Sequence, residues 1–373
     1  MTSFRRTAVP RVLLTVSGTI DPHVRRQVVD GVRPRPDYLV LADAMSADIL
    51  DCAAARAGAG RLGRLIERLA GAHALVAWTC FRRRARYDAI VTDGEQVGLP
   101  LALLWRSRHQ GATAHVMIAH ILSVPKKRYL VRLFGLGRRI DAIVVYSSWQ
   151  ERFVTRDLGF PAERVLRSPF MVDTAFFTPG QTAPASDGEP MVATAGLERR
   201  DYETLVAAAR QSAARVVIAA ASNWSKRTDT TPGLELPANV EVRSLSFVPL
   251  RQLYADARFV VMPLEDVEFQ AGVTTILEAM AMGKPVVCSR TRGQTDIVVD
   301  GVTGVYVPPG DANALRNAMA QLLADPQRVR VMGEAARQYV ERDCDVEVYA
   351  KELTSFVAGA IASRQPARAS STA

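Results

Sequence analysis

Short, almost entirely apolar runs recur along the chain, and longer stretches with apolar residues at helical spacing separate them. A strand that is apolar on both faces is typical of a parallel sheet covered by helices on both sides. The pattern therefore predicts a doubly wound α/β architecture. The expected strands lie at 11–17, 38–43, 87–93, 114–120, 141–147, 191–196, 215–221, 259–264 and 285–289.

The alternation is interrupted at residues 176–190, where Pro, Gly, Ser and Thr replace any periodic pattern. A chain of 373 residues also exceeds what one hydrophobic core usually supports. We therefore expect an N-terminal Rossmann-like domain over 1–178 and a C-terminal one over 187–344. A helix over 345–363 is expected to pack back on the N-terminal domain, and 364–373 to form a disordered tail.

Composition narrows the class of protein. With 48% hydrophobic and 23% charged residues, the chain should fold as a soluble globular protein. The apolar run 99–105 is far shorter than the ~18 residues that suggest a membrane span, and 12–16 is too short for a secretory signal. We therefore expect a cytoplasmic protein. Four scattered cysteines without a CxxC spacing fit reduced thiols: Cys52, Cys80, Cys288 and Cys344.

Charge is spread unevenly: residues 1–180 carry a net charge of +12 and the remainder carries −3. Basic clusters lie at 82–86 and 126–128. This face could meet the inner surface of an anionic membrane, an acidic acceptor, or only water. No nucleic-acid-binding motif accompanies the charge, so nucleic acid is not expected as a partner.

The segment 259–289 predicts a strand, a loop, a helix and a second strand in close succession. Ligands of such sheets bind beyond the carboxyl ends of the strands, at helix N-termini. Gly272 allows close approach of a ligand, and the amides that follow it favour an anion such as a diphosphate. Glu278 lies one turn further on, where a buried carboxylate needs hydrogen-bond donors such as ribose hydroxyls. The alternative is an ordinary exposed glutamate.

The residues that follow carry a resemblance. FQAGVTTILEAMAMGKPVV (269–287) and GQTDIVVDGVTGVYVPPGDANALRNAMAQLL (293–323) resemble the donor half of retaining GT-B glycosyltransferases of glycosyltransferase family four. Residues 144–177 and 193–208 are more weakly similar to that family's interdomain passage and second-domain start. The resemblance implies two Rossmann-like domains facing a cleft. It also implies sugar transfer from a UDP- or GDP-sugar with retained anomeric configuration, without a cofactor or an obligatory metal.

By position, the resemblance implies that Glu278 holds the nucleotide ribose. The backbone of the preceding loop would face the donor sugar and β-phosphate; its residues are Ala271, Gly272, Val273 and Thr274. Gln270 stands where the family usually has Glu. Its amide can orient a sugar but cannot act as a base, which leaves the catalytic carboxylate unassigned, with Glu265 and Glu268 as alternatives.

Positive groups are needed where the diphosphate leaves, because charge accumulates there. Arg199 and Arg200 follow the first strand of the second domain, and Lys226 and Arg227 lie on a second loop. We expect Arg200 and Lys226 to take part in catalysis, with Arg199 and Arg227 as donor contacts. Each of them could instead be a plain surface charge.

The N-terminal domain should supply the acceptor side. Gly18 follows the first strand and could approach the donor. Asp93 and Glu95 follow the strand at 87–93 and are candidate acceptor contacts, although helix capping also explains them. His120 ends the strand at 114–120, and the resemblance implies that it faces the donor sugar. The acceptor itself, a small molecule or a lipid-linked one, cannot be identified from the sequence.

Two other functions share the fold. A non-catalytic nucleotide-sugar binder is favoured by Gln270, and a nucleotide-sugar epimerase would keep the fold with a different reaction.

Overall fold

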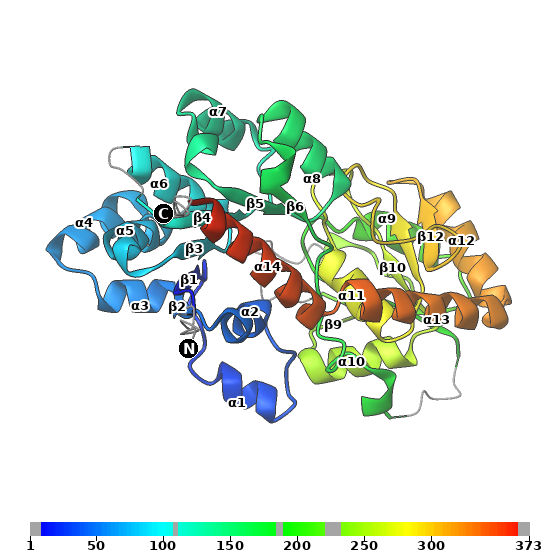
Figure 1. Ribbon diagram of the computed structural model, residues 1–373. Helices are drawn as coiled ribbons and strands as arrows, with labels where there is room; N and C mark the ends of the chain where they lie inside the picture. Colours follow the sequence, from blue (N-terminus) through cyan, green and yellow to red (C-terminus); the bar gives the residue numbers. More distant parts are fainter. Residues whose placement is uncertain (1–8, 107–110, 184–188, 221–232, 365–373) are drawn as a thin grey trace, which may run out of the picture.

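The computed structural model describes residues 9–106, 111–183, 189–220 and 233–364. Within them the framework is two parallel six-stranded sheets (Figure 1), ordered β2-β1-β3-β4-β5-β6 and β12-β11-β10-β7-β8-β9. The first sheet contains β1 (Val12–Thr15), β2 (Asp48–Leu50), β3 (Ala89–Thr92), β4 (Ala114–Ile118), β5 (Ala142–Val145) and β6 (Val165–Arg167). The second contains β7 (Met191–Ala195), β8 (Arg215–Ala219), β9 (Val240–Arg243), β10 (Phe259–Met262), β11 (Val286–Ser289) and β12 (Gly304–Val307).

Helices cover both faces of each sheet, as continuous apolar strands require. Those before the linker are α1 (Val24–Val29), α2 (Asp37–Met45), α3 (Cys52–Ala57), α4 (Arg61–Ala70), α5 (Ala72–Arg83), α6 (Glu95–Arg106), α7 (Pro125–Leu133) and α8 (Ser148–Arg152). Those after it are α9 (Tyr202–Ala209), α10 (Phe247–Asp256), α11 (Val273–Ala281), α12 (Ala312–Ala324), α13 (Pro326–Asp343) and α14 (Val346–Arg364). The first sheet is buried between α2 with α14 and α5 with α6. This arrangement confirms the predicted α/β class.

One predicted strand is wrong. Residues 38–43 belong to helix α2, which packs against α14 and buries most of its side chains in the core that it shares with that helix. A helix buried on nearly all sides carries the same continuous apolar run as a buried strand, so periodicity could not separate the two. Four strands were missed: β2, β6, β9 and β12. They are the edges of the two sheets, and each is partly exposed.

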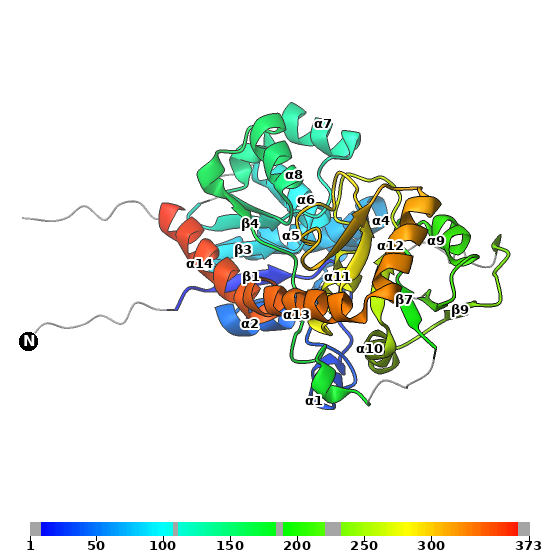
Figure 2. The same cartoon turned by 90° about the vertical axis from the view of Figure 1, so that its right-hand side faces the viewer.

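The chain crosses between the two sheets twice, and the two crossings lie side by side. Val172 pairs with Asp345: its amide donates to the Cys344 carbonyl at 2.9 Å and its carbonyl accepts from the Val346 amide at 3.0 Å. Helices α13 and α14 run along one side of the molecule, α13 on the second sheet's helices and α14 across the first domain (Figures 1 and 2). The end of the chain thus returns to the first sheet.

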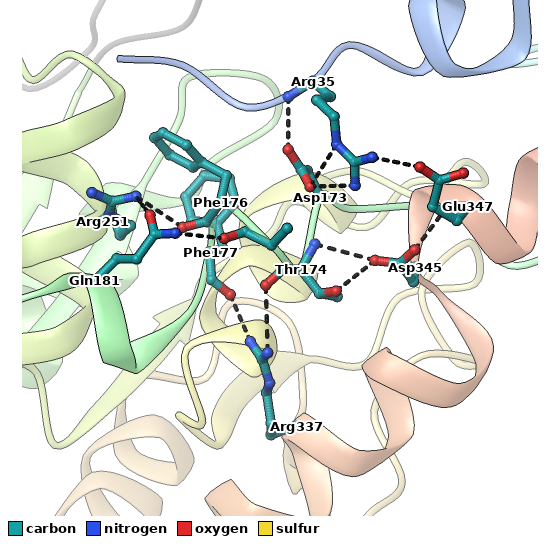
Figure 3. A network of polar contacts seen from close by, with 11 residues as sticks. Arg35, Asp173, Thr174, Phe176, Phe177, Gln181, Arg251, Arg337, Asp345 and Glu347 are labelled. Carbon is teal, nitrogen blue, oxygen red and sulfur yellow. Dashed lines mark hydrogen bonds and ion pairs between the residues drawn. The ribbon is translucent and has the colours of Figure 1, made fainter. Parts of the chain in front are cut away.

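The linker is held from both domains by arginines (Figure 3). The Arg35 guanidinium donates to Asp173 at 2.9 Å and to Glu347 at 2.5 Å. From the other side Arg337, on α13, donates to the backbone carbonyls of Thr174 and Phe177 and to that of Ala281. Guanidinium groups suit this task because several donors diverge from one rigid plane.

Candidate functional site

A small pocket lies where the two domains meet. Residues 119–123 line it from the end of β4, and Trp149 and Gln150 from α8. Glu268 and Phe269 complete it from the loop after β10, in the second domain. Close by, the Ser148 amide and hydroxyl donate to Asp296 at 2.6 Å and 2.9 Å, which ties α8 to the second domain.

Helix α11 begins at Gly272, whose φ of +77° is in the left-handed region. A Cβ at this position would lie 2.6 Å from the Met262 sulfur, so both conformation and space require glycine. Ala271 and Val273 are buried, whereas Thr274 is exposed in the first turn. The first amides of a helix have no partner within it and carry partial positive charge, so this end can receive an anion.

The Arg200 guanidinium lies beside the start of α11. It is buried, and it donates to the carbonyls of Ala195 and Glu198 at 2.8 Å and 2.6 Å. A Cβ at Gly272 would lie 3.3 Å from its Nη1, and one at Gly196 would lie 2.5 Å from its Nη2. Burial lowers the pKa of Arg200. A positive charge held this close to a helix N-terminus suits a phosphate.

Glu278 is buried, with 6% of its surface exposed, and its Oε2 accepts from the Tyr254 hydroxyl at 2.9 Å. Burial raises its pKa to about 7, because the Tyr254 hydrogen bond and the charge of Arg200 only partly offset the loss of water. No donor among the described residues contacts Oε1. Among these residues Oε1 therefore still lacks a hydrogen-bond donor such as a hydroxyl. Glu278 does not line the interdomain pocket described above.

Gln270 is buried, yet neither its Nε2 nor its Oε1 has a hydrogen-bond partner within the described part of the chain. Gln294 is adjacent: its Nε2 donates to the Ala271 carbonyl at 3.0 Å, and its Oε1 is likewise unpaired. Buried polar atoms without partners are rare in native proteins, and each needs an explanation. A bound sugar, which offers both donors and acceptors, would satisfy them. The sequence analysis had not singled out Gln294.

On the first domain, His120 and Asp93 lie together, with 3.7 Å between Nε2 and Oδ1. Burial alone would lower the pKa of His120, but Asp93 outweighs this and holds it above the ordinary value. Asp37, at the start of α2, was not singled out by the sequence analysis; it directly precedes the segment 38–43 that was predicted to be a strand. Burial and the charge of Asp93 raise the pKa of Asp37 to about 6. His120, Asp93 and Asp37 thus form a cluster of one imidazole and two carboxyl groups.

Glu95 has a different setting from Asp93. It is buried and accepts from the backbone amides of His120 and Ile121 and, at 2.7 Å, from the Lys127 ammonium. Burial alone would raise the pKa of Glu95, but the charge of Lys127 holds this pKa below its ordinary value. Glu95 therefore fixes the loop that carries His120. Gly18 is exposed after β1, where an added Cβ would meet open space.

The carboxylates considered as alternatives to Gln270 both form ion pairs. Arg199 pairs with Glu265 at 2.8 Å, and Arg292 pairs with Glu268 at 2.9 Å, so both alternative carboxylates already have cationic partners. Lys226 and Arg227 lie outside the described residues. In the part of the chain that is described, no three His, Cys, Asp or Glu side chains are grouped to hold a metal ion. All four cysteines are buried and free.

Comparison with known proteins addresses the second domain most directly. Residues 195–325 match the family model described as glycosyl transferases group 1. This stretch contains Arg200, Gln270 and Glu278. The chain also superimposes on the Anabaena protein HepE, whose crystal structure is a complex with UDP and glucose, with a TM-score of 0.67 and 16% identity. The match covers 94% of this chain and 99% of that one. The fold is therefore GT-B.

Relatives matched by sequence are glycosyltransferases by name. The chain is 33% identical over 135 residues to a GDP-mannose-dependent α-(1-6)-phosphatidylinositol monomannoside mannosyltransferase of Mycolicibacterium smegmatis, across 36% of this chain and 32% of the relative. It is 28% identical over 237 residues to the putative colanic acid biosynthesis glycosyltransferase WcaL of Escherichia coli. This match covers 60% of this chain and 57% of the relative. The matches thus span less than two thirds of either relative.

Proposed function

We propose that this protein is a retaining glycosyltransferase of family four that transfers a sugar from a UDP- or GDP-sugar to an acceptor. The proposal rests on two buried side chains near the α11 N-terminus. Gln270 precedes the helix and has no hydrogen-bond partner among the described residues, and Glu278 lies within the helix. The family match over 195–325 supports the reaction class. The names of the relatives and of the structural neighbour support both nucleotides, GDP in one and UDP in the other.

Each residue then has a definite task in the donor site. Glu278 accepts hydrogen bonds from the ribose hydroxyls, and Gln270 orients the sugar through its amide. The diphosphate lies at the α11 N-terminus, where the backbone of Gly272 permits close approach. Arg200 stabilises the charge that develops on the diphosphate as the glycosidic bond breaks. The reaction is proposed to need no obligatory metal or cofactor.

The acceptor side is proposed to be formed by the first domain. His120 faces the donor sugar, its imidazole oriented by Asp93, and Gly18 leaves space in front of the β1 loop. Glu95 acts through the loop that it holds. Lys226 and Arg227 remain proposed phosphate contacts, and Arg199 a contact near the donor. The protein is proposed to work in the cytoplasm, with peripheral contact to the inner membrane face.

A panel of nucleotide sugars tests the reaction. Slow hydrolysis of one donor, with release of UDP or GDP that persists in EDTA, is the expected result. Product anomers identified by NMR establish retention. A donor that binds in calorimetry without any turnover would replace the transferase by the non-catalytic binder, which is the alternative that Gln270 favours.

A further inference from the structure

Helix α4 turns an apolar stripe to the solvent. At about 3.6 residues per turn, Leu62, Leu65 and Leu69 lie on one face of this helix, and they are 55%, 50% and 77% exposed. We call these three residues the leucine stripe. Gly63 is the only residue of α4 that is buried. Isolated exposed leucines are ordinary, but three aligned on one short helix mark an interaction surface.

The orientation of α4 is fixed by the opposite face. A Cβ at Gly63 would lie 3.0 Å from the Ala59 Cβ and 3.2 Å from Leu75, so the helix lies close against its neighbours. Glu67 pairs with Arg56 at 2.6 Å. The leucine stripe therefore cannot turn inward without breaking these contacts.

Positive charge borders the stripe. Arg61, Arg64 and Arg68 are exposed on the next face of α4, and in the described stretches no carboxylate forms an ion pair with them. The only acidic residue of the helix, Glu67, is already paired. On the Gly63 face of α4, away from the stripe, lies an open groove whose α5 side is lined by Trp78, Arg82, Arg83 and Arg86.

We infer that the leucine stripe docks on an anionic phospholipid bilayer. The leucines insert between the lipid headgroups, and the bordering Arg61, Arg64 and Arg68 contact lipid phosphates. An apolar stripe beside unpaired cations complements this surface. A second copy of the chain fits less well, because its α4 would bring another row of arginines and no free carboxylate.

Docking through α4 would also orient the molecule. His73, in the first turn of α5, lies 2.9 Å from the Ser17 carbonyl, so the turn between α4 and α5 adjoins the loop that carries Gly18. The acceptor side of the first domain would then lie close to the bilayer. The docking surface itself does not depend on the proposed reaction, and sedimentation with vesicles tests it without any turnover.

The experiment compares full-length variants by co-sedimentation with two kinds of vesicle. One kind is phosphatidylcholine alone, and the other an equal mixture with phosphatidylglycerol. Leu69→Asp changes the stripe, and Val331→Asp is its matched control: Val331 is 51% exposed on α13, and both substitutions add the same charge. Circular dichroism should show all variants folded, since both sites are exposed.

We expect wild type and Val331→Asp to bind the mixed vesicles and not phosphatidylcholine alone. Leu69→Asp should bind at least ~tenfold more weakly, because a carboxylate replaces inserted apolar surface. Binding should also weaken between about 0.1 M and 1 M salt, where the screening length falls from about 10 Å to about 3 Å.

Three results would overturn the inference. The first is a wild type that leaves the mixed vesicles unbound. The second is equal binding by both variants, which would leave no role for the stripe. The third is a wild-type dimer that Leu69→Asp converts to a monomer without any vesicle binding, which would assign the stripe to self-association.

Discussion

Replacing Glu278 by Gln should stabilise the free protein and weaken nucleotide binding at the same time. The substitution keeps the shape of the side chain and an oxygen that can accept from Tyr254. It removes a negative charge that burial makes costly. Raising the pKa of Glu278 from 4.5 to about 7 corresponds to roughly 3 kcal/mol.

The sign of the pH effect follows from where the proton is bound. The folded protein holds the Glu278 proton more tightly than the unfolded chain does. This contribution to stability is therefore complete below about pH 4.5 and is lost as the pH rises through about 7. Relative to wild type, Glu278→Gln should gain up to roughly 3 kcal/mol in free energy of unfolding between pH 5 and pH 8.

Binding should change in the opposite direction. A carboxylate that accepts from ribose hydroxyls gains about 1.5–3 kcal/mol per hydrogen bond, against about 0.5–1.5 kcal/mol for a neutral amide. At pH 8 the variant should therefore bind UDP or GDP with a Kd about 5- to 150-fold higher. Calorimetry with each nucleotide and denaturant unfolding at both pH values measure the two effects.

The control is Glu334→Gln on α13, where the carboxylate is exposed in a pair with Arg330. Glu334→Gln should change neither the free energy of unfolding nor the Kd for the nucleotide. Unchanged nucleotide affinity in Glu278→Gln, together with the expected gain in stability, would show a buried carboxylate with no contact to the nucleotide, and the donor-site assignment would fail. The same pH dependence of unfolding in wild type and variant would refute the burial argument.

Three further changes test other parts of the site. Gln270→Glu should lower kcat/KM for the best donor at least ~tenfold, because the amide's donor group is lost; an increase would show that Gln is an impaired replacement. Asp93→Asn should lower the pKa of His120, visible by NMR titration and as an activity profile displaced to lower pH; an unmoved titration would contradict their coupling. Arg337→Ala should reduce the free energy of unfolding by about 2–4 kcal/mol, whereas Arg330→Ala in an exposed pair should cost under about 1 kcal/mol; equal losses would deny Arg337 its role in the linker.

The strands in the middle of each sheet were predictable, and those at the edges were not. Central strands such as β3 and β10 are covered on both faces and read as unbroken apolar runs. Edge strands such as β6 are partly exposed, so their sequences lack that run. Helix α2 produced the converse error, since burial on nearly all sides removed its helical period. An apolar run therefore indicates that a segment is buried, and it does not distinguish a strand from a helix.

The candidate site shows the same division between local and long-range information. Gly272, Gln270 and Glu278 lie within nine positions of one another, and the resemblance of this one segment to a family was enough to propose them together. Tyr254, which donates to Glu278, is 24 residues away and carried no signal of its own. Its role follows only from the packing of α10 against the second sheet.

Contacts between domains are the extreme case, because they join residues with no common local pattern. Ser148 and Asp296 are 148 positions apart, and their hydrogen bonds set α8 against the second domain beside the interdomain pocket. Arg35 reaches Asp173 over 138 positions at the linker. These contacts place the domains so that His120 and the loop of Glu268 line one pocket. The candidate residues could therefore be proposed from the sequence one domain at a time, whereas the position of His120 relative to the loop of Glu268 depends on how the two domains pack.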